Sequence, residues 1–105
     1  MIARRWHGRV PQAKAEAYLA LMRDVALPDY RSTPGNRGAW CLSRGEGEVV
    51  HVEMLTFWDG MEAIARFAGE DVERAKYYDF DDHFLIEKEP SVLHFDAFGE
   101  PGGER

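Results

Sequence analysis

The fold is decided by residues 37–57, which read RGAWCLSRGEGEVVHVEMLTF. Two stretches with the composition of strands, 37–44 and 48–57, flank Gly45-Glu46-Gly47. A short glycine-containing loop between two such stretches is typical of a β-hairpin. The pattern therefore predicts two adjacent antiparallel strands in the middle of the chain.

The residues before the hairpin predict a strand and a helix. Residues 2–7 suit a short strand that ends at Gly8, and Pro11 suits a first helical turn because its missing N–H would have no partner there. From Gln12 an apolar stripe recurs at helical spacing, and Pro28 is expected to end or kink this helix. The stripe consists of Tyr18, Leu21, Met22 and Val25.

The residues after the hairpin predict a second helix and a last strand. Asp59 and Glu62 are spaced as a variant of the capping box, which marks a helix start. The helix is expected to bury Met61, Ile64, Phe67 and Ala68 and to end at Gly69. A further helical stretch is expected from Asp71 through Tyr78, and a strand over 91–98.

The predicted order is β-α-β-β-α-β, an α+β ferredoxin-like arrangement with an antiparallel sheet. A length of 105 residues suits one domain. We expect that domain to cover 1–98 and the Gly- and Pro-containing tail, 99–105, to be disordered.

Composition argues against several partners. The formal net charge of −6 and the scattered basic residues disfavour nucleic acid. No apolar run approaches the roughly 20 residues that cross a bilayer, so no membrane partner is expected. A single cysteine, Cys41, allows no internal disulfide and fits a cytoplasmic location without a signal peptide.

Two strands carry a histidine two positions from an acid, which places both side chains on one strand face. The pairs are His51 with Glu53 and His94 with Asp96. A carboxylate that orients an imidazole produces a general base, so His51 and Glu53 are the candidate catalytic pair. The alternative interpretation is a plain ion pair on a solvated or subunit-facing sheet surface. A metal site is disfavoured because strand spacing does not bring four ligands together.

An aromatic group after the hairpin is the second candidate. Trp58, Phe67, Tyr78 and His83, together with His94, are the predicted substrate-binding residues, since Trp and Tyr combine apolar area with a polar tip. Most of this group also suits a core, with Tyr78 and His83 the better pocket candidates.

The first strand carries two arginines on opposite faces. Arg4 and Trp6 share one face, and Arg5 and His7 share the other. Arg4 or Arg5 could meet an anionic substrate or form a structural pair.

The chain resembles the antibiotic biosynthesis monooxygenase (ABM) superfamily of dimeric α/β barrels. The resemblance covers Ile2 to about Phe98 and lies mostly in turn, cap and packing positions. Its stretches are Arg4-Arg5-Trp6, Thr33-Pro34-Gly35-Asn36-Arg37-Gly38, Phe57-Trp58-Asp59-Gly60-Met61-Glu62-Ala63-Ile64, Phe67-Ala68-Gly69-Glu70-Asp71, Ala75-Lys76-Tyr77-Tyr78 and Val92-Leu93-His94-Phe95.

The resemblance implies a homodimer with a cavity between sheet and helices in each subunit. It further implies a monooxygenase that needs no cofactor or metal and acts on a small aromatic or quinone-like substrate. Two alternatives stay open, a non-catalytic dimer that binds a small hydrophobic molecule and a haem-binding or haem-degrading protein. Haem-degrading relatives use an Asn, a Trp and a His, and this chain has Trp58 and His83 but no Asn in its first strand.

Overall fold

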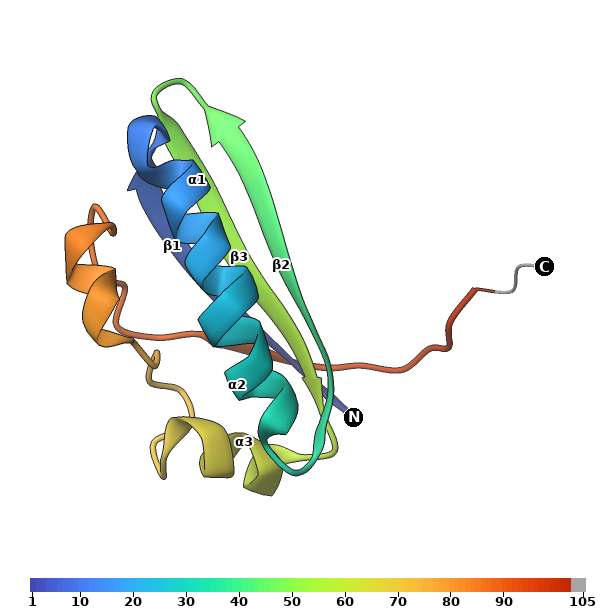
Figure 1. Cartoon of the computed structure of the whole chain (residues 1–105). Helices are drawn as coiled ribbons and strands as arrows, with labels where there is room; N and C mark the ends of the chain where they lie inside the picture. Colours follow the sequence, from blue (N-terminus) through green and yellow to red (C-terminus); the bar gives the residue numbers. More distant parts are fainter. Residues whose placement is uncertain (103–105) are drawn as a thin grey trace.

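Within residues 1–102, which the computed structural model describes, four strands form one antiparallel sheet in the order β2-β3-β1-β4 (Figure 1). Their bounds are β1 Ile2–Pro11, β2 Asn36–Glu46, β3 Val49–Trp58 and β4 Leu93–Asp96. β1 pairs with β3 along its whole length, from Ile2 opposite Trp58 to Pro11 opposite Val49. The hairpin and the ferredoxin-like order are confirmed, and β1 extends past the predicted end at Gly8.

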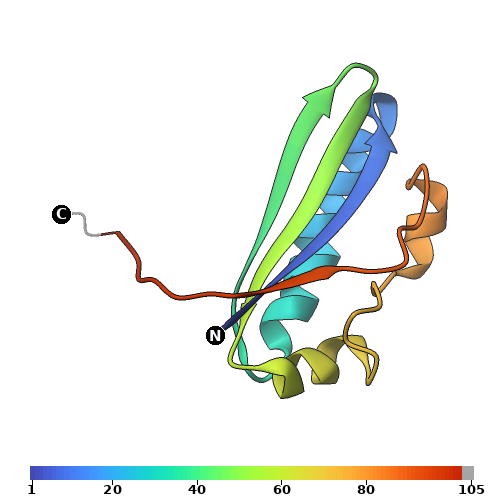
Figure 2. The ribbon, with the colours of Figure 1, turned by 180° about the vertical axis from the view of Figure 1, so that it is seen from behind.

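The helices cover one face of the sheet and leave the other bare (Figures 1 and 2). Alternation along β1 and β3 sends one set of side chains toward the helices, where they are buried. The opposite side is called the open face below. Its residues include Arg5, His7, Arg9, Trp40, Leu42, His51, Glu53, Leu55, Phe57, Leu93 and Phe95.

The first helix is longer than predicted and changes pitch. α1 spans Gln12–Leu21, a π-helical turn η1 spans Met22–Ala26, and α2 continues over Leu27–Ser32. Pro28 does not end the helix, because it lies in the first turn of α2, where a proline N–H is not needed. The wider turn changes which residues face the sheet. Val25 is therefore 40% exposed, contrary to the predicted stripe, whereas Ala26 and Tyr30 are buried.

The second helix, α3, spans Met61–Ala68 and ends at Gly69, as predicted. Gly69 has a φ of 94°, which suits a residue without Cβ. The predicted capping box does not form. Gly60 is the N-cap, and the Asp59 carboxylate lies 3.6 Å from Arg37 Nε instead.

The helix predicted from Asp71 to Tyr78 is absent, and these residues are irregular up to the 3₁₀ helix η2, Asp79–His83. The reason is that backbone amides and carbonyls of this stretch form hydrogen bonds with residues distant in sequence, and a helix would need the same groups. Arg4 donates to the carbonyls of Val72 and Arg74, and the Ala75 amide donates to Pro90. Residues 70–92, called the cover segment below, thus lie across the helix side of the sheet. The last strand is shorter than the predicted 91–98.

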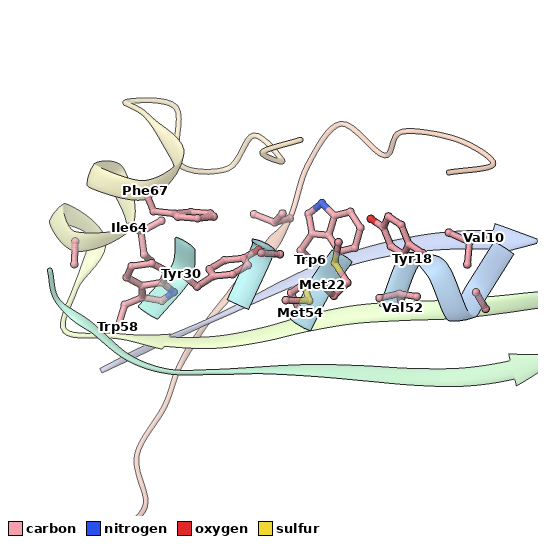
Figure 3. Packing of buried hydrophobic residues seen from close by; sticks show 14 residues of the cluster. Trp6, Val10, Tyr18, Met22, Tyr30, Val52, Met54, Trp58, Ile64 and Phe67 are labelled. Atoms are coloured by element: carbon pink, nitrogen blue, oxygen red, sulfur yellow. The ribbon is translucent and has the colours of Figure 1, made fainter. Parts of the chain in front are cut away.

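The core lies between the sheet and the helices (Figure 3). Trp58 is fully buried and contacts Tyr30 and Phe67, whose rings stack at 4.2 Å between centroids.

Among the described residues, no helix is both long and apolar enough to cross a membrane. The predicted disordered tail, 99–105, extends beyond the described residues, which end at 102.

Candidate functional site

The catalytic candidate His51 lies on the open face, away from the helices. Its Nδ1 is 2.9 Å from His7 Nε2, and its Nε2 is 2.9 Å from Glu46 Oε1. His7 Nδ1 is in turn 2.6 Å from Glu89 Oε2. A carboxylate only accepts hydrogen bonds, so each carboxylate faces an outer ring nitrogen, and the two inner ring nitrogens face each other. The two imidazoles therefore form a hydrogen-bonded chain between two carboxylates.

Glu53 does not orient His51 as predicted. Its two oxygens accept from Arg5 Nε at 3.0 Å and Nη2 at 2.7 Å, a bidentate pair that lowers the pKa of Glu53. The physical reason is position: Arg5 on the neighbouring strand β1 reaches the carboxylate diagonally and presents a matching fork. Glu46, at the end of β2, contacts His51 instead.

His94 points to the opposite side of the sheet from His51. Its Nε2 lies 3.1 Å from Arg4 Nη1. Since a guanidinium only donates, this nitrogen accepts and the His94 proton lies on Nδ1. Burial, and then the Arg4 charge, lower the pKa of His94. The two histidine–acid pairs of the sequence therefore do not form one site.

The predicted aromatic group is divided between core and pocket. Trp58 and Phe67 are core residues, and Trp58 Nε1 donates to Thr56 Oγ1 at 2.8 Å. His83 is exposed and contributes its backbone carbonyl to Lys14. Tyr78 is the member of the group that lines a cavity.

This cavity lies between the sheet, the first helix and the cover segment. It leaves about 10 Å³, room for about one water molecule. Its walls are mostly aromatic and sulfur-containing. The lining residues are Trp6, Tyr18, Met22, Ala26, Tyr30, Met54, Lys76, Tyr78 and Asp81.

Asp81 is the acid of this cavity and is 1% exposed. Its Oδ1 accepts from the Tyr18 hydroxyl at 2.7 Å, and its Oδ2 accepts from the Tyr78 amide at 2.7 Å. Burial raises the pKa of Asp81, although these two hydrogen bonds favour the ionised form. A buried carboxyl with a raised pKa is what a general base requires near neutral pH.

Trp6, which lines the same cavity, carries a donor without a hydrogen-bond partner. It is 4% exposed, its Nε1 has no hydrogen-bond partner, and that nitrogen points away from the strands (Figure 3). A buried polar group without a partner costs roughly 1–3 kcal/mol. An acceptor atom of a ligand that reached this nitrogen would satisfy the donor.

Asp29 in α2 also joins the first helix to the cover segment. Asp29 Oδ2 accepts from the Tyr78 hydroxyl at 2.7 Å and from Lys76 Nζ at 3.0 Å. Burial alone would raise the pKa of Asp29, but these two hydrogen bonds bring it below its usual value. Lys76 and Tyr78 both line the cavity, so this contact holds two of its lining residues in place.

The raised pKa of Asp81 predicts that the difference in stability between wild type and Asp81→Asn depends on pH. Protonation of Asp81 adds to the free energy of unfolding, and this contribution is fully present below the usual Asp pKa of about 4. The contribution is lost as the pH rises through the higher pKa that Asp81 has in the folded state. Denaturant unfolding of wild type and Asp81→Asn should show the wild-type advantage largest at pH 4 and smaller at pH 8. A constant difference would contradict the raised pKa.

Sequence reasoning missed Asp81 and Trp6 as site residues. Asp81 belongs to Asp79-Phe80-Asp81-Asp82, where nothing in the pattern distinguishes the buried acid from its exposed neighbours. Trp6 shares a strand face with Arg4, as alternation predicts, and that face proves to be the cavity floor.

Among the described residues, no group of three or more His, Cys, Asp or Glu is arranged to hold a metal ion.

Comparison with solved structures identifies the fold class. The chain is similar to a point mutant of MhuD with two manganese protoporphyrin IX bound per active site, at 19% identity and a TM-score of 0.61, covering 98% of this chain and 100% of that one. It is also similar to Rv0793 from Mycobacterium tuberculosis, at 14% identity and a TM-score of 0.58, covering 97% and 100%. No protein-family model and no curated protein matches. The chain therefore has the small α+β fold of these two structures.

Proposed function

We propose that the chain binds a small aromatic molecule in the helix-side cavity and acts on it as a cofactor-independent monooxygenase. The observation that carries the proposal is that Trp6, whose buried Nε1 has no partner, lines the same aromatic cavity as the buried Asp81 carboxyl. A cavity with aromatic walls and few polar groups is the usual form of a small-molecule site.

The proposal assigns the base to Asp81 instead of His51. Asp81 would take a proton from an activated CH₂ of a polycyclic phenol or its keto form. The resulting carbanion reduces O₂ and forms a C–O bond, and cleavage of the O–O bond leaves C=O and releases water. The substrate supplies all the electrons, so the protein contributes a base and a dry pocket.

Access requires the cover segment to move, because the closed cavity has room for about one water molecule. The contacts of Lys76 and Tyr78 with Asp29 are partly exposed and join the cover segment to the helix edge. Outward movement of these two side chains would widen the cavity while the sheet stays in place.

The π-helical turn supports a functional role for this cavity. Met22 and Ala26, the first and last residues of η1, both line it. Single π-helical turns interrupt hydrogen bonding in a helix and occur frequently at functional sites. Without this turn, Val25 would follow the predicted apolar stripe.

The residues present do not fit haem. Among the described residues that line the cavity, none is a histidine, so no imidazole is available there to bind a haem iron. His94 is engaged with Arg4, and His83 is exposed. We therefore favour a smaller aromatic ligand over the haem alternative.

Trp6→Phe tests binding. Phenylalanine keeps an aromatic wall but removes the N–H, so a ligand such as 1-naphthol should bind about 5- to 10-fold more weakly, the value of about one hydrogen bond. Titration calorimetry measures the affinity, and Trp40→Phe on the open face is the matched control. Equal affinity of Trp6→Phe and wild type would contradict the proposal.

Turnover separates the enzyme from a non-catalytic binding dimer. The enzyme should consume O₂ in the presence of anthrone, whose central CH₂ is activated, and should form the quinone. A purely binding protein would be stabilised against heat by 1-naphthol and would consume no oxygen above the rate in buffer. The second outcome would leave the binding proposal in place and remove the reaction.

We further propose that a second copy of the chain covers the open face. Four large apolar side chains from both edge strands, Trp40, Leu42, Leu93 and Phe95, are each 46–54% exposed there. The charged residues between them already form pairs, such as Arg5 with Glu53 and Arg9 with Glu87. An apolar surface with internally paired charges suits a self-complementary interface.

Leu42→Glu tests the dimer. A carboxylate placed in the interface would lack a partner, so the variant should sediment as a monomer while wild type sediments as a dimer. Val25→Glu, at a similarly exposed apolar position on the first helix, should leave the dimer intact. A monomeric wild type would contradict the proposed assembly.

A further inference from the structure

Arg4 is a buried cation without an anionic partner. It is 1% exposed, and among the described residues it makes no ion pair. Its hydrogen-bond partners are neutral: the Val72 carbonyl at 2.5 Å, the Arg74 carbonyl at 3.1 Å and His94 Nε2 at 3.1 Å. A buried charge is costly when no opposite charge compensates it, and burial lowers the pKa of this guanidinium.

Part of the Arg4 hydrogen-bonding capacity is also unused. Three of the five guanidinium N–H groups are engaged, and the buried Nε has no partner. Buried donors normally find an acceptor, so the free Nε–H requires an explanation.

Arg4 is close in sequence and in space to Trp6, a residue that lines the proposed site. Arg4 and Trp6 point to the same side of β1 and are about 7 Å apart along the strand. Tyr30, which lines the cavity, is close enough that the Arg4 charge lowers its pKa, against the larger effect of burial, which raises it. Two buried donors without partners, one of them charged, therefore belong to residues two positions apart on β1, the strand that forms the cavity floor.

We propose that the ligand of this cavity is an aromatic carboxylate, with its carboxylate accepting from Arg4 and its ring system lying against Trp6 and Tyr78. A carboxylate is ionised in the resting state at neutral pH, so it compensates the buried charge before any reaction occurs. It is also the acceptor whose geometry matches a guanidinium edge. This inference rests on the proposed function, because it names the substrate class of the same cavity.

Titration calorimetry with 1-naphthoate and 1-naphthamide tests the inference. The two probes share the ring system and differ in charge. Wild type should bind 1-naphthoate at least 10-fold more tightly than 1-naphthamide. Arg4→Gln should abolish this preference. Arg5→Gln removes the same charge from the neighbouring position and should keep the preference, because Arg5 lies on the open face, paired with Glu53.

The outcomes separate the two proposals. Equal affinities of wild type for both probes would overturn the carboxylate inference and leave the aromatic cavity in place. Binding of neither probe would overturn the proposed site itself. Loss of the preference in Arg5→Gln but not in Arg4→Gln would overturn the assignment to Arg4. The wild-type comparison decides the question even if Arg4→Gln does not fold.

Discussion

Asp81→Asn should reduce the rate of anthrone oxidation about 100- to 10,000-fold, the usual contribution of a general base. Asparagine has nearly the same shape as aspartate but cannot take a proton. His51→Ala should turn over at close to the wild-type rate, since His51 lies on the opposite face of the sheet from the cavity. Oxygen uptake, corrected for the spontaneous reaction in buffer, measures both rates.

A matched control is available next to Asp81. Asp82 is exposed and pairs with Lys88, so Asp82→Asn removes the same charge without reaching the cavity. Its rate should equal that of wild type. The opposite pattern, with activity lost in His51→Ala and retained in Asp81→Asn, would restore the sequence-based assignment of His51 as the base.

Trp58→Ala should lower the free energy of unfolding by about 3–5 kcal/mol, the range for large aromatic residues truncated in a core. Trp58 is fully buried, packs against Tyr30 and Phe67, and donates to the buried Thr56 hydroxyl, which would lose this donor. Denaturant unfolding followed by circular dichroism measures the loss.

Trp58→Phe provides the graded comparison for this core position. It keeps most of the buried area and should lose less stability than Trp58→Ala. If Trp58→Ala kept wild-type stability but no longer bound 1-naphthol, Trp58 would be a substrate-binding residue, as the sequence suggested, and not a core residue.

Much of the fold could be predicted because its signals are local. The hairpin depends on Gly45-Glu46-Gly47 between two strand-like runs, and the end of α3 depends on Gly69. The course of the first helix through Pro28 could not be predicted, since no local sequence pattern marks the π-helical turn before it. The irregular course of 71–78 likewise depends on Arg4, which is distant in sequence.

The candidate site could be predicted only in part. Alternation correctly grouped His51 with Glu53 and Arg4 with Trp6, because a strand has a period of two. Alternation does not tell which of these two groups faces the helices. Residues on that side can line the cavity, and residues on the other side belong to the open face. The pairing of Glu53 with Arg5, and of His51 with His7 and Glu46, depends on strand register between distant residues.

The indole N–H signals of the chain test the location of the site most directly. The three tryptophans occupy three different environments: Trp6 in the cavity, Trp58 in the core and Trp40 on the open face. In a ¹H–¹⁵N spectrum assigned with the Trp6→Phe and Trp40→Phe variants, titration with 1-naphthol should shift the Trp6 signal downfield as its free N–H gains an acceptor. The Trp40 and Trp58 signals should stay in place. A shift of Trp40 with an unmoved Trp6 would place the ligand on the open face and contradict the account.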